Sequence, residues 1–172
     1  MGEPIDRIEW RPVDSLRGND YNPNVTFNAE LDLLERSILT YGWTTAILVN
    51  RDGTIIDGFH RARVAASSKA LRERYAGKVP CSVIDVAVPE AMILTVAMNR
   101  ARGTHVAGRM SDLVRRLIDE HGMDPDDLAK RIGGDRAEID LLYQADLLKH
   151  RKIQSHEYSR AWVPEETTRR AG

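Results

Sequence analysis

The sequence is short of the residues that usually cross-link a protein or anchor it in a membrane. Cys81 is the one cysteine among 172 residues, which excludes an internal disulfide and a metal site built from several cysteines. Aromatic residues make up 6% of the chain, and no apolar run approaches the roughly 18 residues that a membrane-spanning helix needs. The first ten residues also lack the basic start and apolar stretch of a secretion signal. These absences predict a cytoplasmic protein without a membrane partner.

The chain has no excess of charge of either sign. Lys and Arg number 25 against 26 Asp and Glu, which gives a formal net charge of −1. A dedicated nucleic-acid-binding protein usually has a basic balance or a basic face, so any such role must depend on local asymmetry. The five histidines show no spacing typical of metal ligands. What the chain does have, 42% hydrophobic and 30% charged residues, is sufficient for a globular protein with a core.

Helical and strand-like patterns alternate in the first 103 residues. Apolar residues recur at helical spacing in "FNAELDLLERSILTYG", whereas "AILVN" and "TIID" read as strands joined by the turn Asp52-Gly53. A helix is expected from Arg61 to Tyr75, followed by the strand "KVPCSVIDV" and by the helix "PEAMILTVAMNRARG". The alternation predicts a mixed α/β (α+β) domain that we place at residues 1–104.

Only helices are expected after that domain. Ser111 is a candidate start for the helix "MSDLVRRLIDEHG", and "DPDDLAKRIGGDRAEIDLLYQADLLKH" reads as two helices broken at Gly133-Gly134. We therefore predict an all-helical region at residues 105–150 and a polar C-terminal tail at residues 151–172.

The segment "TIIDGFHRARVAA" combines a short apolar strand with a dense group of charges. A strand that ends in Asp57-Gly58 and turns directly into a helix places the first N–H groups of that helix at the strand's exit, where they favour anions. Gly58 lets a ligand approach the backbone, and His60 and Arg61 can donate hydrogen bonds to phosphate oxygens. Asp57 can orient an arginine or hold a metal ion on the phosphates. A plain turn followed by a solvated helix face fits the same residues.

The order of these elements and the motif "DGFHRAR" resemble the ParB/sulfiredoxin superfamily, in which a glycine–x–basic–Arg motif between a strand and a helix binds nucleotide phosphates. The ParB version matches at Gly58, Arg61 and Arg63, whereas Phe59 and His60 depart from it. The sulfiredoxin version matches at Gly58, His60 and Arg61, but Phe59 stands where sulfiredoxin has its nucleophilic cysteine, which argues against that activity. The Asp-Gly-x-His-Arg form of the free-serine kinases matches at Asp57, Gly58, His60 and Arg61.

The resemblance covers about residues 8 to 148. The segment "MNRARG" is similar to an Asn-x-x-Arg segment of ParB that closes over the nucleotide, which assigns Asn99 and Arg102, with Arg100 nearby. The segment "DDLAKRIGGDRAEIDLL" is similar to the helix-turn-helix of ParB. The fold that this implies is a small mixed-sheet ParB/sulfiredoxin-like domain followed by a helix-turn-helix-like region.

The function implied by the resemblance is that of a ParB-like nucleotide-binding protein, with CTP or ATP and Mg²⁺, that associates with DNA. The nucleotide or its phosphates would contact Thr44, Thr45, Gly58, Phe59, His60, Arg61, Asn99, Arg100 and Arg102, with Asp57 as the metal ligand. Contacts to DNA would come from Arg115, Arg116, Lys130, Arg131 and Arg136. Because the second helix also carries Asp135, Glu138, Asp140 and Asp146, we expect weak DNA binding at most, and a helical pair used for packing fits equally well. ParB-like proteins commonly dimerise, so a homodimer is a further implied partner.

Three other activities stay open. A phosphotransferase of the free-serine-kinase type would use a nucleoside triphosphate, Mg²⁺ and a base that the sequence does not select among Asp14, Asp20 and Glu30. A ParB-like nuclease would need several convergent carboxylates, and the sequence offers only Asp52 and Asp57. A nucleotide-independent adaptor would keep the fold without the site. The sequence leaves open which base the nucleotide carries and whether its phosphate is held, hydrolysed or transferred.

Overall fold

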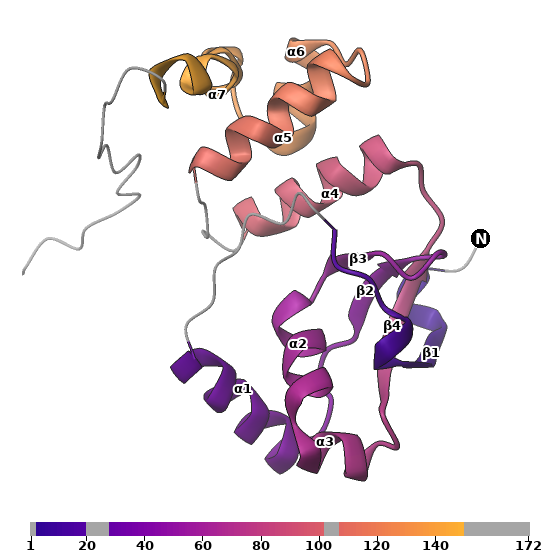
Figure 1. Cartoon of the computed structure of the whole chain (residues 1–172). Coiled ribbons are helices and arrows are strands. Elements are labelled where there is room, and N and C mark those ends of the chain that lie inside the picture. Colours follow the sequence, from indigo (N-terminus) through magenta and orange to yellow (C-terminus); the bar gives the residue numbers. More distant parts are fainter. Residues whose placement is uncertain (1–2, 20–27, 102–106, 150–172) are drawn as a thin grey trace, which may run out of the picture.

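The structure is a computed structural model that describes residues 3–19, 28–101 and 107–149. It is a mixed α/β fold in which a sheet with flanking helices is followed by a helical region (Figure 1). The elements in chain order are η1 (Pro4–Asp6), β1 (Ile8–Pro12), η2 (Val13–Ser15), α1 (Asn28–Tyr41), β2 (Ile47–Asn50), β3 (Ile55–Asp57), α2 (Phe59–Ser67), α3 (Lys69–Arg74), β4 (Lys78–Ile84), α4 (Val88–Ala101), α5 (Ala107–Asp119), α6 (Pro125–Ile132) and α7 (Arg136–Lys149).

The four strands form one mixed sheet in the order β1-β4-β2-β3. Strands β2 and β4 are parallel, whereas the outer pairs β1–β4 and β2–β3 are antiparallel. Ile47 and Val49 of β2 and Cys81 of β4 are fully buried, and they pack with Ala62 and Ala65 of α2 in the core of this domain. The strands expected from "AILVN", "TIID" and "KVPCSVIDV" are therefore confirmed.

Strand β1 was not predicted from the sequence. Four of its five residues are exposed, so its side chains show no alternation of buried and exposed positions. The strand is held by backbone pairing with β4, in a register that places Ile8 opposite Ser82, and by Trp10, whose ring stacks on Tyr75 at 5.7 Å between centroids. Because β1 is stabilised by pairing with a strand that is distant in sequence, its own residues show no pattern from which the strand could be predicted.

The single helix expected from Arg61 to Tyr75 is in fact two helices, so that expectation was wrong. Ser68 has an extended backbone, and its Oγ accepts a hydrogen bond of 3.1 Å from the N–H of Leu71, which caps α3. The same hydroxyl donates to Glu35 on α1 at 2.5 Å. Ser68 thus ends one helix, begins the next and fixes both against α1.

Helix α4 takes part in two cores. On one side Thr95 Oγ1 lies 3.2 Å from the carbonyl oxygen of Ile56 in β3. On the other side Met92, Ile93 and Val96 are buried together with apolar residues of α5, α6 and α7. Figure 1 shows α5–α7 on the side of α4 that faces away from the sheet. The domain boundary predicted after residue 104 lies outside the described residues, and the two parts share α4.

Helix α5 begins before the start expected for it at Ser111. Ser111 lies inside α5 rather than at its N-terminus, because the helix extends back through Ala107 and buries Met110. Its hydroxyl donates instead to the carbonyl oxygen of Leu142 on α7, at 2.6 Å. The break expected at Gly133-Gly134 is confirmed, since Gly133 ends α6 with a φ of 72°. Among the described residues, no helix is long and apolar enough to cross a membrane.

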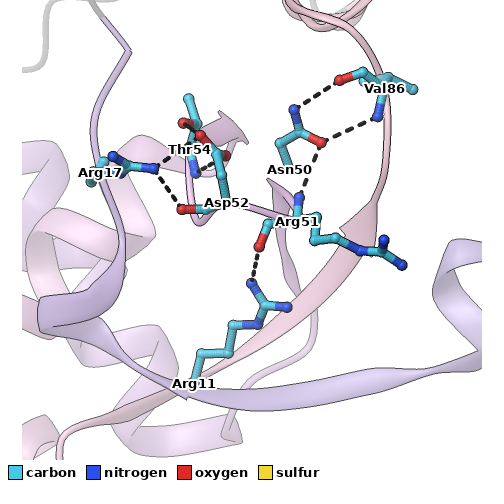
Figure 2. A network of polar contacts seen from close by, with 7 residues as sticks. All are labelled: Arg11, Arg17, Asn50, Arg51, Asp52, Thr54 and Val86. Atoms are coloured by element: carbon cyan, nitrogen blue, oxygen red, sulfur yellow. Dashed lines mark hydrogen bonds and ion pairs between the residues drawn. The ribbon is translucent and has the colours of Figure 1, made fainter.

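The β2–β3 turn is built from side chains that bond to nearby backbone (Figure 2). Asp52 accepts hydrogen bonds from the N–H and the hydroxyl of Thr54 and from Arg17, at 2.9–3.0 Å. The N–H of Thr54 is the main reason that the pKa of Asp52 is below its ordinary value. Asn50 bonds to both the carbonyl oxygen and the N–H of Val86. Asp52 is therefore a turn residue, as its place before Gly53 indicates.

We expect Leu128→Ala to lower the free energy of unfolding by about 2–5 kcal/mol, because Leu128 of α6 is fully buried in the core that the helical region shares with α4 and its truncation leaves a cavity. Leu141→Ala is the matched control, since Leu141 is 41% exposed. Urea unfolding followed by circular dichroism measures both. Equal decreases in the free energy of unfolding for the two variants would show that the shared core contributes little to stability.

Candidate functional site

A pocket of about 400 Å³ lies beside the turn that joins β3 to α2. Its volume is within the range of roughly 300–1,000 Å³ that small-molecule sites occupy. Helix α1, the loop before β2, the β3–α2 turn and α4 all contribute to its wall. The predicted residues that line it are Thr44, Thr45, Asp57, Gly58, Phe59, His60, Arg61 and Asn99.

The β3–α2 turn places the start of a helix at this pocket. Strand β3 ends at Asp57, Gly58 has a φ of 95°, and α2 begins at Phe59. The N–H of Ala62 donates to the carbonyl oxygen of Gly58 at 3.0 Å, which is the first hydrogen bond of the helix. The N–H groups that precede Ala62 point toward the helix start, where the helix dipole also favours negative charge.

Arg61 joins three segments of the site. Its Nη1 donates to the carbonyl oxygens of Thr45 and Ala46, at 2.8 and 2.6 Å, and its Nη2 donates to Asp57 Oδ2 at 3.0 Å. The side chains of Arg61 and Asp57 are 16% and 11% exposed. A charged pair with this degree of burial is tolerated because each charge has a partner and hydrogen bonds.

Gly58 is required by the position of that guanidinium group. A Cβ atom at Gly58 would lie 3.0–3.3 Å from Nη2, Cζ and Nε of Arg61. The arginine head therefore lies directly over the backbone of the turn. Two features thus explain the glycine of the "DG" pair: a left-handed backbone conformation and the packing of an arginine against the backbone.

Not every predicted contact lies at the pocket. Arg100 forms an ion pair with Glu138 of α7, at 2.5 Å, and donates to the carbonyl oxygen of Gly133 at 3.1 Å. It is absent from the pocket lining, whereas its neighbour Asn99, 3% exposed, is part of it. Arg102 lies outside the described residues. Phe59 lines the pocket and also packs against the sheet core.

The wall formed by α1 was not identified from the sequence. Leu34, Ser37 and Ile38 line the pocket together with Trp43 from the loop after the helix. The helical spacing of Leu34 and Ile38 indicates an apolar face, but that pattern is the same whether the face covers a core or a cavity. Only the placement of α1 beside the β3–α2 turn makes these residues part of the site.

The described residues of the site contain few potential metal ligands. Among the described residues no group of three or more His, Cys, Asp or Glu side chains could hold a metal ion. Asp57 lines the pocket, but one of its oxygens receives the hydrogen bond from Arg61. The role of Asp57 as a ligand of Mg²⁺ stays a prediction, with the geometry favouring Arg61 as its partner.

The acids considered as catalytic bases lie away from the pocket or outside the described residues. Asp14 forms two hydrogen bonds with Arg72, at 3.0 and 2.8 Å, and these hold the pKa of Asp14 below its ordinary value. Glu30 is exposed on α1 and does not line the pocket. Asp20 lies outside the described residues.

The basic residues predicted to contact DNA each face an acid of the same chain. The pairs are Arg115–Asp119 at 3.9 Å, Arg116–Glu120 at 3.5 Å, Lys130–Asp127 at 3.7 Å, Arg131–Glu90, and Arg136 with Asp126 at 3.0 Å and Asp140 at 2.9 Å. The hydrogen bond to Asp140 is the main cause of the raised pKa of Arg136. Each of these five basic residues therefore lies beside a carboxylate that partly neutralises its charge.

The chain is similar in sequence to two bacterial proteins, whereas no family model matches it. It is 35% identical over 165 residues to Uncharacterized protein YbdM of Escherichia coli, which covers 94% of this chain and 78% of that protein. It is 30% identical over 132 residues to Chromosome-partitioning protein ParB of Myxococcus xanthus, which covers 74% of this chain but 43% of that protein.

Two solved structures resemble the fold. A pNOB8-like ParB N-domain superposes with a TM-score of 0.58 at 14% identity, over 86% of this chain and 74% of that one. The C-terminally truncated ParB of Caulobacter crescentus, complexed to the centromeric parS site, superposes with a TM-score of 0.50 at 21% identity, over 79% of this chain and 70% of that one. At these identities the likeness shows the fold.

We expect Gly58→Ala to destabilise the protein more than Gly77→Ala. Both glycines have positive φ angles, 95° and 68°, so each substitution costs about 1–2 kcal/mol for the backbone alone. A methyl group meets open space at Gly77 but the Arg61 guanidinium at Gly58. Thermal unfolding compares the two variants directly. Equal decreases in Tm would mean that the Arg61 side chain moves aside for the methyl group without a loss of stability.

Proposed function

Because the chain belongs to the same family as Escherichia coli YbdM and contains a ParB-like N-terminal domain, we propose that it binds a nucleoside triphosphate in the pocket beside Gly58. The observation that carries this proposal is the β3–α2 turn, which brings a helix N-terminus and His60 to one pocket. Helix N-terminal N–H groups and a left-handed glycine form a common phosphate-binding arrangement.

The remaining wall of the pocket suits the rest of a nucleotide. Thr44 and Thr45 supply hydroxyl groups opposite the turn, and Asn99 supplies an amide from α4. Leu34 and Ile38 give an apolar surface at the α1 side. The phosphates would lie at the turn, and the nucleoside would extend toward α1, with CTP and ATP as the two candidates that the motif resemblance implies.

Binding is favoured over phosphoryl transfer by the distribution of carboxylates. A kinase needs a base near the acceptor hydroxyl, and a nuclease commonly needs several acids around metal ions. Among the residues that line the pocket, Asp57 is the carboxylate, and it is paired with Arg61. Mg²⁺ would be held mainly by the phosphates of the nucleotide, where it would neutralise phosphate charge.

Calorimetry with CTP, ATP and GTP in the presence of Mg²⁺ tests the proposal. We expect binding at millimolar concentrations or tighter, and we expect His60→Ala to weaken it roughly tenfold by removing a donor to phosphate. His121→Ala is the matched control, because His121 is exposed in the helical region. Heat absent with all three nucleotides would refute nucleotide binding, and equal effects of the two histidine variants would refute the assigned role of His60.

We further propose that the helical region associates with DNA weakly. The solved Caulobacter crescentus ParB is bound to its parS site, and the chain shares that fold. The ion pairs of Arg131 with Glu90 and of Arg136 with Asp140 leave few cations for phosphate contacts. Each such contact contributes about 0.9 to the salt slope of affinity, so few contacts mean weak binding.

Fluorescence anisotropy with a short DNA duplex at two salt concentrations tests this second proposal. We expect Asp140→Asn, which removes one of the two carboxylates that face Arg136, to strengthen binding a fewfold, whereas Glu73→Gln removes an equal charge on α3 and changes little. A tight, site-specific complex of the unmodified protein that survives high salt would contradict the expectation of weak binding.

A further inference from the structure

We infer that Asp57 and Arg61 form a positioning pair for the pocket: Asp57 orients Arg61, and Arg61 holds the Thr45–Ala46 segment against the β3–α2 turn. The inference deepens the proposed nucleotide site and depends on it only for what the pocket holds. It assigns Asp57 to an arginine rather than to a metal ion, and it gives Arg61 a task other than that of a phosphate ligand.

The hydrogen-bond capacity of Arg61 supports this assignment. A guanidinium group has five N–H donors, two on each Nη atom and one on Nε. Both hydrogens of Nη1 are used by the carbonyl oxygens of Thr45 and Ala46, and one hydrogen of Nη2 is used by Asp57. At least three of the five donors therefore serve protein atoms before any ligand arrives.

The segments that Arg61 joins are separate in sequence. Thr45 and Ala46 precede β2, Asp57 ends β3, and Arg61 itself lies in the first turn of α2. The loop before β2 has no strand pairing of its own, because β2 begins only at Ile47. The two bonds from Nη1 therefore fix this loop to the turn, and with it the hydroxyl groups of the pocket wall.

Because both side chains are largely buried, the Asp57 carboxylate and the Arg61 guanidinium each need the other charge for stability. The Asp57 side chain is 11% exposed and the Arg61 side chain 16% exposed, and removing one partner from such a pair leaves the other charge poorly solvated. The guanidinium also lies over the Gly58 backbone, where a Cβ atom would come within 3.0 Å of Nη2. Asp57, Gly58 and Arg61 thus depend on one another, because the carboxylate pairs with the guanidinium and the glycine leaves room for it.

The experiment uses the full chain without ligand as its first measurement. Backbone NMR order parameters of Thr45 and Ala46 should be near 0.85 in the unmodified protein and should fall below about 0.6 in Asp57→Ala and in Arg61→Lys. Arg61→Lys keeps the positive charge but loses the fork that reaches two carbonyl groups. Asp57→Asn keeps an oxygen acceptor and should restore much of the order. Asp85→Asn and Arg63→Lys, both at exposed positions, are the matched controls.

The second measurement is the affinity for CTP or ATP with Mg²⁺ and with EDTA. A positioning role predicts that Asp57→Ala weakens binding by the same factor in both conditions and that Asp57→Asn recovers part of it. A metal ligand predicts a loss confined to Mg²⁺ that Asn does not restore.

The outcomes separate the inference from the proposed function. Order parameters at Thr45 and Ala46 that do not change in Asp57→Ala and Arg61→Lys would overturn the inference, whatever the affinity does. If the unmodified protein binds no nucleotide, the proposed function fails, while the order parameters still decide whether the pair holds the loop. If Asp57→Ala does not fold, Asp57→Asn and Arg61→Lys carry the test.

Discussion

Helix α4 contacts the sheet on one side and α5–α7 on the other, and both halves of the chain depend on this constraint. Thr95 bonds to β3 on the sheet side, whereas Met92 and Val96 are enclosed with α5–α7. Fully burying a Met or Val side chain contributes about 1.5–3 kcal/mol. A sheet domain without the helical region would leave Met92 and Val96 in water, and the helical region without α4 would lose a wall of its core. The two parts therefore stabilise each other.

The C-terminal turn of α4 extends this dependence to the pocket. Asn99 lines the pocket, and the next residue, Arg100, is bound by Glu138 and by the Gly133 carbonyl oxygen. Successive residues on a helix point about 100° apart, so one turn can present two neighbours to two surfaces. The ion pair with α7 thus holds the helix that supplies Asn99, and the helical region contributes to the pocket without lining it.

Much of the fold could be predicted because its signals are local. The helix over Asn28–Tyr41, the turn at Asp52-Gly53 and the break at Gly133 depend on spacing, on a hairpin turn and on a left-handed cap, all of which lie within a few residues. Strand β1 could not be predicted because its stability comes from β4, about seventy residues later. The division at Ser68 was missed because its bond to Glu35 is likewise remote.

In the candidate site, too, the contiguous features could be predicted from the sequence and the contacts between distant residues could not. The motif from Asp57 to Arg61 is contiguous, and its residues do line one pocket with Thr44, Thr45 and Asn99. The part that Arg61 plays is not visible in the motif, since its acceptors are backbone carbonyl groups that any residue at positions 45 and 46 would offer. The pairing of Arg100 with Glu138 was hidden for a related reason: a basic residue beside a ligand segment reads the same whether it faces the ligand or another helix.

Phe59 occupies a position of the motif that contributes to packing in the sheet core. The side chain lies between the pocket and the sheet core, near Gly18, at the place in the motif where sulfiredoxin has a reactive thiol. A cysteine there would be smaller by most of an aromatic ring and would leave a cavity under the turn. A cysteine at this position would need larger neighbours to fill the core, so side-chain volume as well as reactivity distinguishes Phe59 from a thiol.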